Sequence, residues 1–197
     1  MLAHPSVSSL SCMSQSINED GTPCENSVWN TLSTGHISLL TMWDWVFSDV
    51  KMFSGDSRVL HRRVIDSFPP LKWSYSEDTP LFMRSFYLGD VALIHEPLVK
   101  YRQHDDSIMG KSRQRKKVTK DRMHQFEETT TKQLKEDLKH AIVNRYIEAE
   151  YVGVVSGKVD EMINWLRPKS QTKLHKGIRK LNRIISRWLN TIDKNIL

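Results

Sequence analysis

Hydrophobic and polar positions divide the chain into a first part with strand and helix patterns and a second part with helical patterns alone. Residues 7–17 contain no proline and carry apolar side chains at short intervals, which predicts a strand. The apolar run at 91–94 predicts a buried strand, and Pro97 separates it from a further short strand at 98–101. We therefore expect α/β or α+β structure up to about residue 110.

Two helices are expected within this first part. One runs from Arg58 to about Ser67 and ends before Pro69 and Pro70, because proline cannot continue a helix. The other begins at Thr79 as N-cap with Pro80 in the first turn, and Gly89 follows its last turn. The polar stretch from 22 to 35 is expected to be a loop.

The second part, from residue 111 onward, is expected to be a helical tail. Residues 116–166 look helical, with a break expected at Gly153 or Gly157, and Pro168 ends this region. A last helix over 172–192 places apolar side chains on one stripe at spacings of three and four: Leu174, Ile178, Leu181, Ile185, Trp188 and Ile192. We therefore predict two units, residues 1–110 and 111–197.

Composition adds charge to this picture. The 197 residues are 39% hydrophobic and 26% charged, which is typical of a globular protein. The net charge of +6 comes from the tail, where residues 167–187 hold eight basic side chains and no acidic one. Two cysteines provide no disulfide framework, and no apolar run approaches the ~20 residues that span a bilayer. These observations predict a cytoplasmic protein, either soluble or bound to a surface.

The candidate chemistry begins with the acidic pair Glu77 and Asp78 at the expected start of a helix. The helix dipole favours the ionised carboxylate there, and a general base must be ionised before it can accept a proton. Acidic residues also occur at helix starts for stability alone, and for an isolated pair that explanation is the stronger one.

The sequence around this pair resembles the C-terminal half of the GT-A, family 2 glycosyltransferases of bacterial polysaccharide synthesis. The resemblance covers roughly residues 1–110. It is carried by these motifs, in order: Gly55-Asp56-Ser57-Arg58, His61-Arg62, Phe68, Pro70-Leu71, Glu77-Asp78-Thr79, Arg84, Leu88-Gly89-Asp90 and Pro97 to His104. It implies a partial GT-A, Rossmann-like mixed sheet with flanking helices, followed by the all-helical tail.

The resemblance also implies roles for individual residues. Asp78 corresponds to the catalytic base, with Glu77 beside it, and removes the proton of an acceptor hydroxyl in an inverting transfer. Arg102 and His104 correspond to the segment near the nucleotide diphosphate, where Arg102 can hold phosphate oxygens. The acceptor side corresponds to Gly55, Asp56, Ser57 and Arg58.

The sequence departs from this family in its nucleotide-binding features. It contains no Asp-x-Asp metal motif and no glycine-rich phosphate loop, and the adjacent Asp105 and Asp106 do not replace the motif. A divalent metal, Mg or Mn, is expected for the complete enzyme, but no residue here can be assigned to it. We therefore expect the acceptor-side half of a transferase, inactive alone. It would be a fragment, a truncated gene product or one part of a split enzyme with a separate N-terminal half. Its partners would be a nucleotide-sugar donor and a saccharide or lipid-linked acceptor. A remnant without activity is a further alternative.

Other readings remain open for several features. Residues 111–190 can form a basic helical module that binds an anionic membrane or nucleic acid. The helix at 172–192 can pack on the protein or lie on the inner face of the plasma membrane, and nucleic acid is disfavoured because no recognised binding motif is present. Arg84 is expected to pair with a carboxylate. The Trp43-Asp44-Trp45 cluster can stack on a sugar or pack in the core.

Overall fold

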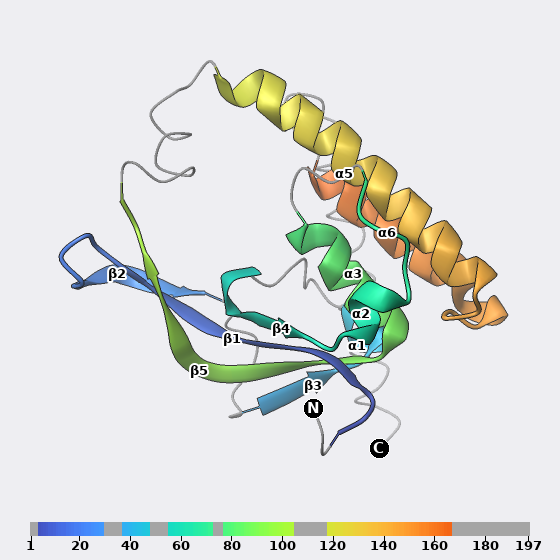
Figure 1. Cartoon of the computed structure of the whole chain (residues 1–197), viewed down its shortest axis with the longest axis horizontal. Helices are drawn as coiled ribbons and strands as arrows, with labels where there is room; N and C mark the ends of the chain where they lie inside the picture. The colour runs from blue at the N-terminus through green and yellow to red at the C-terminus, as the bar shows by residue number, and fades with distance from the viewer. Residues whose placement is uncertain (1–3, 30–36, 48–54, 73–76, 105–117, 167–197) are drawn as a thin grey trace, which may run out of the picture.

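The computed structural model describes residues 4–29, 37–47, 55–72, 77–104 and 118–166. They form a mixed five-stranded sheet with helices on one of its faces (Figure 1). The strands are β1 (Val7–Ile17), β2 (Pro23–Trp29), β3 (Ile37–Leu40), β4 (Arg58–Leu60) and β5 (Asp90–Arg102). The expectation of a mixed sheet with flanking helices is confirmed.

The order of the strands is β2-β1-β5-β3. β4 pairs with the same edge of β1 as β2 does, along a different part of that edge. β1 and β5 are parallel from the pair Val7 and Asp90 to the pair Ile17 and Arg102, and the other pairings are antiparallel. Five serines of β1 are buried although the sequence singled out only its apolar side chains: Ser8, Ser9, Ser11, Ser14 and Ser16. Small side chains at the centre of the sheet let other elements approach it closely.

The helices are α1 (Met42–Phe47), α2 (Arg63–Asp66), α3 (Asp78–Leu88), α5 (Val118–Val143) and α6 (Val152–Leu166). Short 3-10 turns occupy Gly55–Ser57 and Ala149–Tyr151. One hydrophobic core joins strand, α3, α5 and α6 side chains, among them Leu93, Phe82, Leu134 and Val155. The described part of the helical tail therefore packs on the first part, while the division at residue 110 stays a prediction.

Three expectations about strands were wrong in detail. β2 lies in the stretch expected to be a loop, and β4 begins at Arg58, where a helix was expected. Both pair with β1, and such pairing partners cannot be read from local sequence. β5 continues through Pro97 as one strand, because the ladder is irregular at this point and leaves room for a residue without an N–H.

The expected helix break was also wrong. α6 runs through Gly153 and Gly157, and the chain instead turns between α5 and α6, where Arg145 adopts a φ of 58°. α3 begins at Asp78, one residue before the expected cap, and ends at Gly89 as expected. A Cβ on Gly89 would collide with the carbonyl oxygen of Ser6, which accepts a hydrogen bond from the Asp90 N–H at 3.0 Å.

Among the described residues, no helix combines the length and the apolar character needed to cross a bilayer. The amphipathic helix expected at 172–192 lies outside the described residues.

Candidate functional site

The candidate site is built around the first turn of α3, which carries Asp78. Thr79 and Pro80 are buried and fix this turn against the protein, whereas Glu77 is exposed just before it. The Asp78 side chain lies between these extremes of exposure. The first turn therefore holds Asp78 in a fixed position that solvent reaches only in part.

Gly55 lies directly against the Asp78 carboxylate. A Cβ built on Gly55 would overlap the carboxylate group of Asp78, so any larger residue would displace it. The 3-10 turn Gly55–Ser57 is itself anchored, because Ser57 is buried and Ser14 Oγ donates a hydrogen bond to Asp56 Oδ2 at 3.0 Å. Glycine at this position lets the turn and the acidic helix start meet.

Arg58 joins the same group from the start of β4. Its Nη1 donates a hydrogen bond to the main-chain oxygen of Asp78 at 2.7 Å, and its guanidinium carbon lies 5.6 Å from the centre of the Phe82 ring. Four of the residues expected at the site are thus brought together: Gly55, Asp56, Arg58 and Asp78. The roles expected for them remain predictions.

Burial raises the pKa of the Asp78 carboxyl above the ordinary value of 3.8. The positive charge of Arg58 opposes this shift, while the negative charges of Glu77 and Asp56 add to it. Burial likewise lowers the pKa of Arg58, which the charge of Asp78 counteracts. A carboxylate with a raised pKa binds a proton more strongly, which suits a general base.

Arg102 and His104 lie further along the sheet, at the end of β5. Arg102 pairs with Ile17, and its Nη1 donates a hydrogen bond to the carbonyl oxygen of Glu19. Val99 of β5 pairs with Ser14, whose hydroxyl donates a hydrogen bond to Asp56. Arg102 comes three residues after Val99, which places it ~10 Å further along β5 than the position nearest to Asp56. His104 follows as an exposed residue. Their expected contact with a diphosphate stays a prediction.

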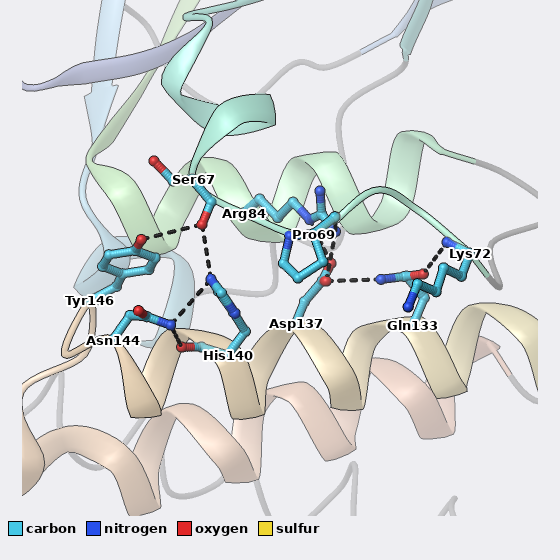
Figure 2. A network of polar contacts seen from close by, with 9 residues as sticks. All are labelled: Ser67, Pro69, Lys72, Arg84, Gln133, Asp137, His140, Asn144 and Tyr146. Carbon is cyan, nitrogen blue, oxygen red and sulfur yellow. Dashed lines mark hydrogen bonds and ion pairs between the residues drawn. The ribbon is translucent and has the colours of Figure 1, made fainter.

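A buried ion pair ties α3 to α5 (Figure 2). Arg84 donates from Nε and Nη2 to the two carboxylate oxygens of Asp137, both at 2.8 Å, and both side chains are 2% exposed. The expectation that Arg84 pairs with a carboxylate is confirmed. Sequence reasoning did not find Asp137, because 53 residues separate the partners and no local pattern relates them.

The same network holds the segment that leads toward Asp78 (Figure 2). Gln133 donates to Asp137 Oδ1 at 2.9 Å and accepts from the Lys72 N–H at 2.9 Å. Arg84 Nη2 also donates to the carbonyl oxygen of Pro69 at 2.9 Å. At the other end of the segment, Tyr146 donates to the carbonyl oxygen of Ser67 at 3.2 Å. Contacts from α3, α5 and Tyr146 thereby fix the path of residues 67–72.

The tryptophan cluster packs in the core. Trp45 is 1% exposed and stacks on Phe86 with ring centres 5.6 Å apart. Trp43 contacts Tyr151 edge-on, at 4.3 Å between ring centres. Packing accounts for both side chains.

The described residues contain no group of three or more His, Cys, Asp or Glu side chains that could hold a metal ion. Neither a protein-family model nor a curated protein sequence matches this chain.

Proposed function

We propose that this chain is the acceptor-side part of an inverting, family 2-like glycosyltransferase with a partial GT-A sheet. It would move a sugar from a nucleotide-sugar donor to the hydroxyl of a saccharide or glycolipid. The contact between the Asp78 carboxylate and Gly55 carries the proposal, because it joins the two motifs that the resemblance assigns to catalysis and to acceptor binding.

In this proposal Asp78 removes the proton of the acceptor hydroxyl as its oxygen attacks the anomeric carbon of the donor. The new glycosidic bond forms while the bond from that carbon to the diphosphate breaks, and the nucleotide diphosphate leaves with the negative charge. The raised pKa of Asp78 supports this role, since it increases the affinity of the carboxylate for the proton. Glu77 adds negative charge beside the base.

The diphosphate requires positive charge, for which we propose Arg102 and His104. The described residues offer no ligand set for Mg or Mn, so no step is assigned to a metal. We propose that a donor-binding segment outside these residues completes the site, and that the chain alone does not turn over. The proposed location is the cytoplasm or the inner face of the plasma membrane, where lipid-linked acceptors are found.

Transfer assays on a completed enzyme test the proposal. The chain would be joined to the segment encoded upstream of Met1 and supplied with a panel of nucleotide sugars and lipid-linked acceptors. We expect Asp78→Asn to lower turnover by at least about 100-fold, the scale of a lost general base, with the fold intact by circular dichroism. Asp66→Asn is the matched control, because Asp66 is an exposed carboxylate on α2 that pairs with Arg62.

Two results would contradict the proposal. Turnover that survives Asp78→Asn removes Asp78 from the role of base. Absence of transfer from every nucleotide sugar in the completed protein argues against a transferase.

A further inference from the structure

The pairing of the strands places apolar side chains in rows across the sheet. Leu10 of β1 pairs with Val59 of β4 on one side and with Ala92 of β5 on the other, and Ala92 pairs with Leu39 of β3. Paired residues point to the same face of a sheet. These four side chains therefore form one apolar row across four strands.

A second apolar row lies beside the first. Cys12 of β1 pairs with Ile94 of β5, which pairs with Ile37 of β3. Since each of these residues is two positions from a member of the first row, both rows lie on the same face. We call the two rows together the apolar sheet face.

The apolar sheet face is the one opposite the helices. Val91 and Leu93, the residues on either side of Ala92 in β5, point the other way and belong to the hydrophobic core. Figure 1 shows all the labelled helices on that other side of the sheet. No helix of the described residues covers the apolar sheet face.

Large side chains on this face are open to solvent. On the edge strands β3 and β4, Ile37 is 66% exposed, Leu39 50% and Val59 56%, whereas the central Ala92 and Cys12 are 7% and 5% exposed. The centre of the sheet is the parallel pair β1 and β5. All-parallel sheets are normally covered on both faces, whereas antiparallel sheets can leave one face in water. In this mixed sheet, the exposed apolar side chains on β3 and β4 favour a covering element over this face.

Among the segments of this sequence outside the described residues, the one after Leu166 is long enough to supply a covering helix. The five other such segments have at most 13 residues, whereas 31 residues follow Leu166. Within these, the sequence pattern at 172–192 predicts a helix with a six-residue apolar stripe. At 1.5 Å per residue such a helix is ~31 Å long, which exceeds the ~14 Å across four strands.

We propose that residues 172–192 form a helix that docks its apolar stripe on the apolar sheet face. The basic side chains lie mostly off that stripe, so they remain in water when the stripe is covered. Because the helix is tethered to the same chain, its effective concentration is far above that of a separate partner. The result is a three-layer structure with helices on both faces of the sheet. This proposal does not depend on the transferase function.

Cross-linking in the full chain tests this docking. Leu39→Cys would be introduced with Cys12→Ala and Cys24→Ala, and a short reagent that joins a thiol to an amine would be added. We expect intramolecular cross-links from residue 39 to the native Lys173, Lys176 and Lys180, found by mass spectrometry of the monomer. The control is Val143→Cys, a 70%-exposed position at the end of α5, with at least fivefold fewer cross-links to the same lysines.

A second pair of variants tests the role of the stripe. Leu181→Glu puts a charge on the stripe and is expected to lower the cross-link from residue 39 at least fivefold. Asn182→Glu, one position away and off the stripe, is expected to leave it unchanged. Equal yields from residues 39 and 143, or cross-links only between two copies of the chain, overturn the proposal. Co-sedimentation of the chain with phosphatidylglycerol vesicles, lost in Leu181→Glu and without any cross-link from residue 39, assigns the helix to a membrane and also overturns it.

Discussion

Asp137 and Asp78 both lie at α3 and differ in how far other groups compensate their negative charges. Asp137 meets the middle of the helix, is 2% exposed, and has both oxygens bound by Arg84 and one also by Gln133. Asp78 starts the same helix, is partly exposed, and Arg58 donates to its main-chain oxygen. Because both carboxylate oxygens of Asp137 are bound, its charge stabilises the packing of α5 on α3. Incomplete compensation leaves Asp78 with a raised pKa and therefore with affinity for a proton.

The largest effect is expected from breaking the compensated pair. Asp137→Ala leaves the guanidinium of Arg84 buried without its partner, which costs about 3–5 kcal/mol in the free energy of unfolding. Denaturant titration followed by circular dichroism measures this loss. Asp66→Ala, which breaks the exposed pair with Arg62, should cost at most about 1 kcal/mol.

A double replacement distinguishes the contribution of the ion pair to stability from the contribution of the volume that its side chains fill. Arg84→Met with Asp137→Leu removes both charges and keeps apolar volume, so it should be clearly more stable than Asp137→Ala alone. A double variant as unstable as the single one would mean that the bonds to Pro69 and Gln133 matter more than the ion pair.

A smaller effect is expected where the uncompensated aspartate meets Gly55. Gly55→Ala places a methyl group where the Asp78 carboxylate lies, and relief of such overpacking costs about 1–3 kcal/mol. Denaturant titration of the variant gives the value. Gly153→Ala is the control, because a Cβ there meets no atom within 4 Å and alanine favours a helix by about 1 kcal/mol. Equal effects of the two replacements would contradict the contact between Gly55 and Asp78.

The smallest effect concerns Asp78 itself and depends on pH. A folded-state pKa above 3.8 means that folding favours the protonated carboxyl, so stability is lost as pH rises through the folded-state pKa. Asp78→Asn cannot ionise and should therefore exceed the natural protein in stability at neutral pH. The gain should be below about 1 kcal/mol, because solvent reaches the group. Denaturant titrations at about pH 3 and pH 7 should show the difference shrinking at the lower pH. A variant that is less stable only at neutral pH would indicate a stabilising anion.

Local patterns in the sequence predicted the elements that depend on local chemistry. The strand at β1, the start of α3 and the glycine at its end follow from apolar spacing, Pro80 and Gly89. The strands β2 and β4 did not follow, because β1 provides their pairing partners. The helix break was misplaced because packing overrides the low helix propensity of Gly153.

The residues of the candidate site likewise divide into those that local sequence indicated and those that only the fold brings together. The acidic pair and the Gly55 turn stand out as motifs, and the structure brings them into contact. Asp137 and Gln133 gave no signal, since their roles arise only when α5 packs on α3. Ser14, which holds Asp56, was equally invisible in a strand judged by its apolar residues.

The parallel pairing of β1 with β5 has a consequence for how the chain folds. Val7 and Asp90 are 83 positions apart, so the central ladder closes only after a long loop has been brought together. Contacts between residues so far apart in sequence slow folding. During synthesis, β1 cannot complete its pairing with β5 until residue 102 has left the ribosome. β2 and β4 can pair with one edge of β1 before β5 is made, but the other edge stays open until then, and association with other nascent chains competes with folding at that edge.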